Sequence, residues 1–409
     1  MHEQIFSLNR IKNNKSIICP ILIPIAIFLI ALSIGCASGK RNPLPENQFM
    51  DAEILNTKGI RTFGGELDPL FQKDLMLSVK QIPKDQLSEI QNSALLLSGG
   101  GAHGAFGAGF LNGWSSSGTR PEFKLVTGIS TGALIAPLAF VGQEYNQILQ
   151  NMYTGVSTKD VAKIRGISTL WNDSLADSTP LMEILETFIN EEFIKLVAQA
   201  HNEGRRLYIG TTNLDAQRFV IWNMGALANI DDPRVPELFR KIMLASASIP
   251  IVYPPVMIEV TSNGEVYDEM HVDGGVITQV FFTAAVVDIE EIRKEMLGEN
   301  SPREKGEIFI ILNGSVQPTP EIINRTILNI TERSLSTFLK ASAVSDLRRI
   351  HELSKKEDLK INFVGIPDDF EYTATEAFDR LEMIDLYYLG YKIGLSSERW
   401  EQEVPWVIE

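Results

Sequence analysis

Ser130 stands between two glycines, each two residues away, in the run Gly128-Ile-Ser-Thr-Gly132. Residues 123–127 before it are predicted to form a β-strand, and a helix is predicted to begin at Thr131. A serine on such a tight strand-to-helix turn is a nucleophile elbow, where glycines leave room for the turn. The hydroxyl is then held at the C-terminal end of the sheet, beside backbone N–H groups and the positive end of the helix. The motif predicts acyl-transfer chemistry at Ser130.

A glycine-rich loop, Gly99-Gly-Gly-Ala-His-Gly104, lies upstream, between a predicted strand at 93–97 and a stretch with helical spacing. Successive backbone N–H groups in such a loop bind anions, either a nucleotide phosphate or the oxyanion of a tetrahedral intermediate. The glycine spacing also fits a dinucleotide fingerprint, which requires an acid at the end of the next strand. Glu122 precedes its strand and so lies at the wrong end. We therefore interpret Gly99–Gly101 as an oxyanion hole and keep nucleotide binding as the alternative.

Asp273 ends a third predicted strand, Glu269–Val272, and two glycines follow it. An Asp-Gly pair is common in turns. At the end of a strand, however, the carboxylate can also be directed at a neighbouring strand end. A serine hydroxyl needs a base that takes its proton during attack, and an exposed aspartate is a poor base. If Asp273 is that base, we expect it to be buried and near hydrogen-bond distance of Ser130.

Together, these three motifs resemble the patatin-like phospholipase family over residues 94–275. The resemblance implies a three-layer α/β/α sandwich with a mainly parallel central sheet, and hydrolysis of acyl esters of phospholipids or related lipids. It also implies a serine–aspartate dyad without histidine, metal or cofactor. On this chain, Ser130 would be the nucleophile, Asp273 the general base, and Gly99, Gly100 and Gly101 the oxyanion hole. The remaining motif glycines are Gly104, Gly128, Gly132, Gly274 and Gly275. His103 stands where the family often has arginine or lysine.

A Ser-His-Asp triad is the first alternative, and the chain order of hydrolases would select His351 as its histidine. His351 lies in a charged helical stretch and is interpreted as part of a solvated helix face. His271 would share a strand face with Asp273, and is interpreted as structural. Ser246 and Ser248 lack flanking glycines, and are also interpreted as structural. A nucleotide-binding lipoprotein without enzymatic activity is the second alternative.

The N-terminus has basic residues, an apolar run over 17–34 broken by two prolines, and then Cys36. This pattern is typical of a secretory signal, and the cysteine after Gly35 resembles a bacterial lipoprotein signal. The resemblance implies removal of residues 1–35 and lipidation of Cys36, with a bacterial cell-envelope location, in the outer membrane. An uncleaved anchor helix is the rival interpretation. Residues 36–92 are predicted as a tether and peripheral segment, and 93–400 as the catalytic domain.

The composition limits the partners of the chain. Its 409 residues include 37 basic and 52 acidic ones, a net charge of −15. This charge argues against nucleic-acid binding and gives no attraction to anionic membranes, so a lipid anchor would have to supply proximity. Cys36 is the single cysteine after the signal, which excludes an intramolecular disulfide and a cysteine-based metal site in the mature chain.

The rest of the chain alternates between the two periodicities, which predicts βαβ order and a parallel sheet. The further predicted elements are strands at 206–212, 218–222, 307–312 and 360–364, and helices at 145–164, 180–200, 236–246, 321–355 and 376–395.

Overall fold

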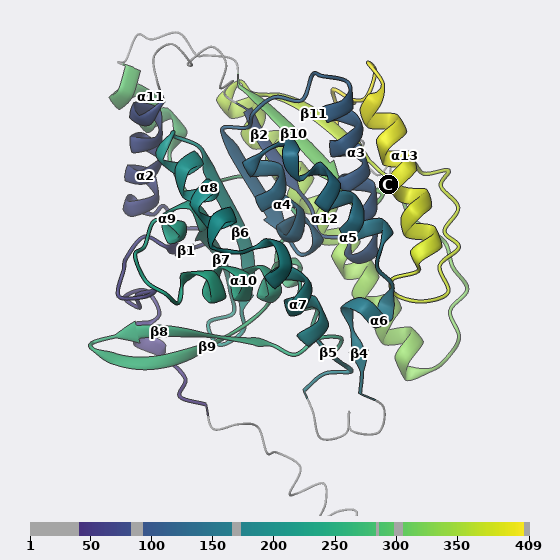
Figure 1. The fold of residues 1–409 in the computed structure, drawn as a ribbon, viewed down its shortest axis with the longest axis horizontal. Coiled ribbons are helices and arrows are strands. Elements are labelled where there is room, and N and C mark those ends of the chain that lie inside the picture. Colours follow the sequence, from purple (N-terminus) through teal and green to yellow (C-terminus); the bar gives the residue numbers. More distant parts are fainter. Residues whose placement is uncertain (1–40, 83–92, 166–172, 284–285, 298–305, 405–409) are drawn as a thin grey trace, which may run out of the picture.

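A nine-stranded sheet forms the centre of the computed structural model, which describes residues 41–82, 93–165, 173–283, 286–297 and 306–404 (Figure 1). Five neighbouring strands are parallel, as predicted from the βαβ order. Their order across the sheet is β6, β3, β2, β10 and β11. Their bounds are β2 Ser93–Leu97, β3 Leu125–Ile129, β6 Arg206–Asn213, β10 Glu307–Leu312 and β11 Lys360–Gly365.

The strands beyond β6 are antiparallel. β7 (Arg218–Asn223) pairs with β6, and β1 (Arg61–Phe63) pairs with β7 at the edge. β9 (Glu265–Asp273) forms a hairpin with β8 (Val256–Ser262) and meets the last residues of β6. This pairing sets Asp273 opposite Thr211, and so brings the end of β9 to the C-terminal end of the parallel strands. A separate two-stranded sheet joins β4 (Lys163–Ile164) to β5 (Ala176–Asp177).

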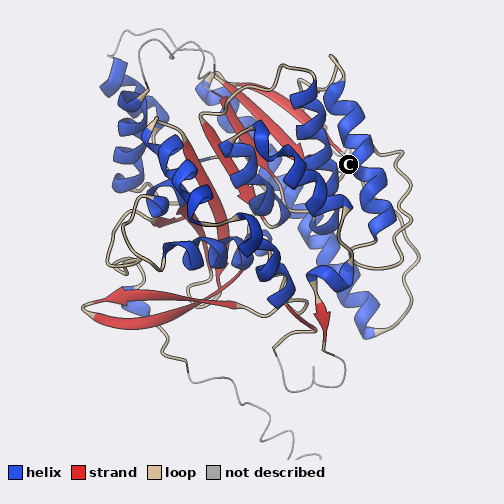
Figure 2. Cartoon of the chain, in the orientation of Figure 1, coloured by secondary structure: helices blue, strands red, loops and turns tan. Residues whose placement is uncertain are grey.

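Helices cover both faces of the sheet, which gives three layers (Figures 1 and 2). Alternate side chains of β2 belong to two different apolar cores: Leu95 and Leu97 to one, and Ala94 and Leu96 to the other. The first core contains side chains of α3 Gly104–Ser116, α4 Thr131–Val141, α5 Asn146–Thr154, α7 Thr179–Phe188, α8 Glu191–Asn202, α9 Met224–Ala228, α10 Val235–Ser246 and α13 Arg380–Leu395. The second contains side chains of α2 Pro69–Gln81, α11 Ile289–Leu297 and α12 Ile327–Glu357. The predicted α/β/α sandwich with a mainly parallel sheet is confirmed.

Two predicted helices differ from the structure because capping residues divide them. The stretch 145–164 contains α5, then the short helix α6 (Thr158–Val161), then β4. Ser157 begins α6 through a capping box with Asp160, so the first helix cannot continue. The stretch 180–200 is divided in the same way, since the Asn190 side chain accepts a hydrogen bond from the N–H of Phe193 and begins α8.

The segment predicted as a tether and peripheral element contributes to the folded unit. Within residues 36–92, β1 is an edge strand of the main sheet, and Phe71 of α2 is fully buried in the second core. The predicted signal at 1–35 and Cys36 lie outside the described residues. Among the residues that are described, no helix has the length and apolar character needed to cross a membrane.

Candidate active site

Ser130 lies on a sharp turn between β3 and α4, as the motif predicted. Its backbone has φ 55° and ψ −125°, a conformation that non-glycine residues seldom adopt. The turn requires the flanking glycines. A Cβ on Gly128 would lie 2.3 Å from the carbonyl oxygen of Gly132, and a Cβ on Gly132 would lie 2.4 Å from that of Leu97. The strained geometry holds Ser130 at the start of α4.

Asp273 lies at the end of β9, and its carboxylate interacts with the Ser130 hydroxyl. Its Oδ1 also accepts a hydrogen bond of 2.7 Å from the N–H of Gly275. Both side chains are buried: 5% of Ser130 and 4% of Asp273 is exposed. Two residues that are 143 positions apart in the sequence (273 − 130) are therefore both buried, and the Ser130 side chain hydrogen-bonds to the Asp273 carboxylate.

Burial raises the pKa of Asp273 to about 7, because the ionised form loses its hydration. The hydrogen bonds from Ser130 and Gly275 act in the opposite direction, since they stabilise the charged form. A carboxylate whose pKa lies near neutrality is a much stronger base than a solvent-exposed one. The carboxylate can thus accept a proton from the hydroxyl beside it.

The glycine-rich loop lies against Ser130, because a Cβ on Gly99 would be 3.3 Å from the Ser130 Cβ. The structure differs from the prediction at Gly99, whose N–H donates to the Gln279 carbonyl oxygen at 3.0 Å and is not available for an oxyanion. For the N–H groups of Gly100 and Gly101, no acceptor is found among the described residues. The N–H groups of Gly100 and Gly101 are therefore the remaining candidate donors to an oxyanion.

Asn313, which directly follows β10, fixes this loop and was not identified from the sequence. Its backbone N–H donates to Ser98 Oγ at 2.8 Å, and its side-chain Nδ2 donates to the Ser98 carbonyl oxygen at 2.9 Å. Its Oδ1 accepts from the N–H of Gly107 at 3.1 Å, at the start of α3. A lone asparagine after a strand has no motif around it, so only the folded arrangement reveals this contact.

Gln279 joins the glycine loop to the Asp273 turn. Its side-chain Nε2 donates to the Gly275 carbonyl oxygen at 2.9 Å, while its own carbonyl oxygen holds Gly99. Its backbone N–H donates to Asp346 Oδ2 of α12 at 2.6 Å. Burial raises the pKa of Asp346 to about 6. One residue therefore connects two of the three motifs to the helix layer behind the sheet.

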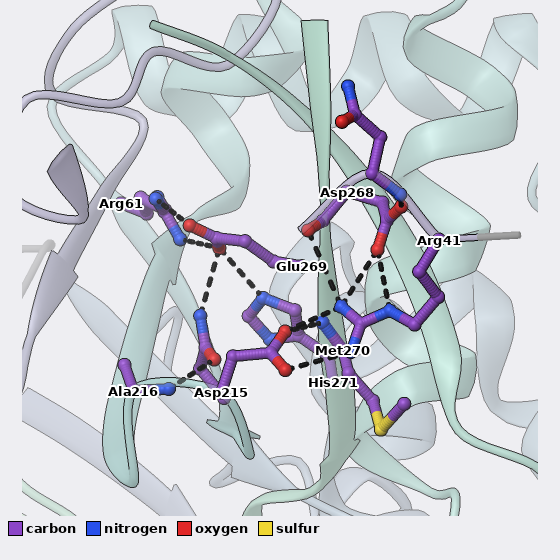
Figure 3. A network of polar contacts seen from close by, with 10 residues as sticks. Arg41, Arg61, Asp215, Ala216, Asp268, Glu269, Met270 and His271 are labelled. Atoms are coloured by element: carbon purple, nitrogen blue, oxygen red, sulfur yellow. Dashed lines mark hydrogen bonds and ion pairs between the residues drawn. The ribbon is translucent and has the colours of Figure 1, made fainter. Parts of the chain in front are cut away.

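A buried polar network stiffens β9, the strand that carries Asp273 (Figure 3). Glu269 forms an ion pair with Arg61 of β1, and its Oε2 accepts from Asn213 Nδ2 at 3.0 Å. The His271 ring lies between Glu269, 3.2 Å from Nε2, and Thr211, 2.9 Å from Nδ1. Burial lowers the pKa of His271. Its two ring nitrogens are used in this network, as expected for a structural histidine.

The outer half of β9 is clamped by Arg41 (Figure 3). Its guanidinium forms two hydrogen bonds with Asp215, of 2.8 and 2.7 Å, and its Nε donates to Asp268 Oδ1 at 2.7 Å. Asp215 also accepts from the backbone N–H of Met270 at 2.8 Å. Hydrogen bonding to Asp215 raises the pKa of Arg41 further, so the clamp stays charged. The first described residue is thereby fixed to the strand that ends at Asp273.

His103 interacts with groups outside the serine–aspartate pair. Nε2 of His103, in the glycine loop, lies 3.8 Å from Glu382 Oε1, and its ring packs on Tyr372 at 5.0 Å between centroids. Burial lowers the pKa of His103, which disfavours a permanent cation at this position. His351 lies on α12, as predicted. Among the described residues, no group of three or more His, Cys, Asp or Glu side chains is placed to hold a metal ion.

The chain is similar to known proteins in sequence and in structure. Residues 95–286, just under half of the chain, match the family model described as Patatin-like phospholipase. An uncharacterized protein, R571 of Acanthamoeba polyphaga mimivirus, is 28% identical over 195 residues, which are 46% of this chain and 60% of that protein. The crystal structure of VipD from Legionella pneumophila is similar at a TM-score of 0.35 with 12% sequence identity, over 75% of this chain and 67% of that one.

Proposed function

We propose that this chain, in which residues 95–286 are a patatin-like phospholipase domain, is a serine hydrolase that cleaves carboxylic ester bonds of phospholipids or related lipids. The observation that carries the proposal is the buried contact between Ser130 and Asp273, whose pKa is raised to about 7. Two backbone N–H groups without an acceptor among the described residues, those of Gly100 and Gly101, belong to the loop that lies against Ser130.

Acylation needs one base and one set of oxyanion donors. The Ser130 oxygen attacks the ester carbonyl carbon while the Asp273 carboxylate takes the hydroxyl proton. The carbonyl oxygen becomes negatively charged, and the N–H groups of Gly100 and Gly101 stabilise it. When the ester C–O bond breaks, Asp273 returns the proton to the leaving alcohol oxygen. The acyl group is left on Ser130.

Deacylation repeats the steps with water as the nucleophile. Asp273 takes a proton from water as the water oxygen attacks the acyl carbon, and the same two N–H groups stabilise the second oxyanion. The bond to the Ser130 oxygen breaks, that oxygen recovers the proton from Asp273, and a fatty acid leaves. No group beyond these side chains and backbone amides is required by this sequence of steps.

Exposed aliphatic side chains near the Asp273 turn support a lipid substrate. Ile251, 54% exposed, has φ 75°, which is a strained conformation for a β-branched residue. Its carbonyl oxygen accepts from the N–H of Leu175 at 2.8 Å, and Ile164 of the paired strand β4 is 74% exposed. Ser248, three residues before Ile251, accepts a hydrogen bond from the N–H of Asp273. Ser248 thus lies close along the chain to an exposed aliphatic side chain, and we propose that Ile251 and Ile164 contact the acyl chains of a lipid substrate.

The proposal is tested by labelling with a long-chain fluorophosphonate together with phospholipid hydrolysis. We expect the wild type to be labelled at Ser130 and to release fatty acid, and Ser130→Ala to lose both because no other hydroxyl replaces the nucleophile. Ser345→Ala is the matched control, since this exposed hydroxyl of α12 bonds to a carbonyl of its own helix. Wild-type protein that is neither labelled nor active on short and long esters would contradict the proposal.

A triad esterase remains the alternative, and His351→Ala separates the two mechanisms. The dyad predicts a rate of ester hydrolysis close to the wild-type value, because the partners of the Asp273 carboxylate are Ser130 and Gly275. A triad predicts a loss of about 10⁶-fold in kcat on removal of its histidine. The second alternative, nucleotide binding at Gly99–Gly104, is tested by calorimetry with dinucleotides.

We also propose that the protein is a lipoprotein of the bacterial cell envelope, lipidated at Cys36 after removal of residues 1–35. Four residues then separate Cys36 from Arg41, which is bound to β9, and five Cα–Cα steps reach at most about 18 Å. The expected result is a native N-terminus that carries the mass of acyl chains on Cys36, and its loss in Cys36→Ser. An unmodified Met1 in the native protein would contradict this assignment.

A further inference from the structure

We propose that Ser246 is a positioning residue for the nucleophile, and that the C-terminal turn of α10 fixes the position of Ser130 relative to Asp273. The inference rests on the proposed function for its catalytic consequence, and on hydrogen bonds for its geometry. The Ser130 backbone N–H donates to Ser246 Oγ at 3.0 Å. Ser246 Oγ in turn donates to the carbonyl oxygen of Gly210 in β6 at 2.6 Å.

The Ser246 hydroxyl is the hydrogen-bond partner of two backbone groups in the interior, the N–H of Ser130 and the carbonyl oxygen of Gly210. Ser246 is fully buried, and the N–H of Ser130 has no acceptor within α4 because Ser130 directly precedes that helix. A buried N–H without an acceptor is rare and costly. The single hydroxyl therefore stabilises the strained conformation of Ser130 and ties it to β6, the strand that pairs with β9.

The same turn holds the base. Two residues after Ser246, the carbonyl oxygen of Ser248 accepts a hydrogen bond of 2.9 Å from the N–H of Asp273. The turn is anchored to its own helix, since the Ser248 side chain donates to the Leu244 carbonyl oxygen at 2.8 Å. One short stretch of chain thus contacts the backbone of both members of the proposed dyad. A small displacement of a reacting group lowers the rate strongly, so the relative position of Ser130 and Asp273 matters for catalysis.

Ser246→Ala and Ser246→Cys test the inference. Cysteine keeps the unbranched shape of serine and fills the space of the hydroxyl with a somewhat larger sulfur that is only a weak acceptor. A packing role would therefore be restored by cysteine, and a hydrogen-bonding role would not. We expect the rate of Ser130 labelling by a short fluorophosphonate, and kcat for a short ester, to fall about 10- to 100-fold in both variants with KM nearly unchanged. Ser354→Ala, which removes another buried hydroxyl bonded within its own helix, should keep the wild-type rate.

Hydrogen exchange gives a second readout that does not depend on catalysis. Loss of the acceptor should speed exchange in the peptide that contains Ser130 at least about tenfold in both variants, while peptides of α12 stay unchanged. Wild-type labelling and exchange in folded Ser246→Cys would overturn the inference. If the wild type itself proves inert, the proposed function fails, and unchanged exchange at Ser130 would still refute the positioning role separately.

Discussion

Asp273→Asn is expected to reduce the rate of ester hydrolysis by at least about 10³-fold. At pH values above 7, the same substitution is expected to raise the melting temperature of the protein. The loss of activity follows because an amide cannot take the proton of Ser130. The gain in stability follows because burial opposes the charged carboxylate and raises its pKa to about 7, whereas asparagine carries no charge. The amide oxygen can still accept the hydrogen bond from Gly275.

The sign of the pH dependence follows from the same shift. Between pH 3.8, the ordinary pKa of an aspartate, and about pH 7, the folded protein holds a proton on Asp273 that the unfolded chain has lost. The free energy of unfolding therefore falls as the pH rises through this window, by at most about 4 kcal/mol from this one group. Activity should show the opposite trend, rising towards and above pH 7 as the base form accumulates.

Thermal unfolding from pH 5 to 9, with the pH profile of kcat, checks both trends. The stability advantage of Asp273→Asn should grow with pH, and the wild-type rate should fall on the acid side of about 7. Asp346→Asn is the comparison for stability alone, because burial raises the pKa of that carboxyl to about 6. An Asp273→Asn protein that hydrolyses esters at the wild-type rate would exclude Asp273 as the base.

Gly100→Ala is expected to lower kcat by about 10²- to 10³-fold in a protein that still folds. A Cβ at this position would lie 2.2 Å from the carbonyl oxygen and 2.6 Å from the Cβ of Asn313. The nearest atom belongs to the backbone at the end of β10, so the loop itself must move. Displacement of the Gly100 N–H removes one of the two proposed oxyanion donors.

Two further glycines separate displacement of the loop from backbone strain. Gly101 has φ 56° with no atom within 4 Å of an added Cβ, so alanine there should lower the rate less than at Gly100. Gly118, at the end of α3, has φ 73° and is equally open. Gly118→Ala therefore reports the stability cost of positive φ alone, about 1–2 kcal/mol, without an effect on kcat. Equal activity of Gly100→Ala and wild type would remove Gly100 from the oxyanion hole.

The amino-acid sequence alone was sufficient to predict the features of the fold that depend on local residue patterns. Apolar runs located β2 and β10 at their observed bounds, and glycine spacing located the turn at Ser130. The helix breaks near Asn190 and Ser157 were missed, because apolar periodicity continues through both positions and the capping geometry decides where the helix restarts. Boundaries that depend on one side-chain hydrogen bond are not visible in periodicity.

The supporting groups of the site could not be predicted, because their roles exist only in the assembled fold. Ser246 lies 116 positions from Ser130, and Asn313 lies 215 positions from Ser98. Gln279 joins Gly275, four positions before it, to the distant Gly99, and none of the three stands in a recognisable motif. Ser246 was interpreted as structural because it lacks flanking glycines, yet its hydroxyl contacts the backbone of Ser130. Residue type alone does not distinguish a buried serine that bonds to its own helix from one that supports a nucleophile.

The segment that matches the family model is smaller than the unit that builds the site. Asn313 follows β10, Asp346 belongs to α12, and Arg61 belongs to β1, and all three lie outside residues 95–286. A polypeptide that contains only residues 95–286 would lack Asn313, which holds the glycine loop, and Arg61, which forms the ion pair with Glu269. The shortest recombinant version able to turn over substrate should therefore begin before Arg61 and extend past Asp346.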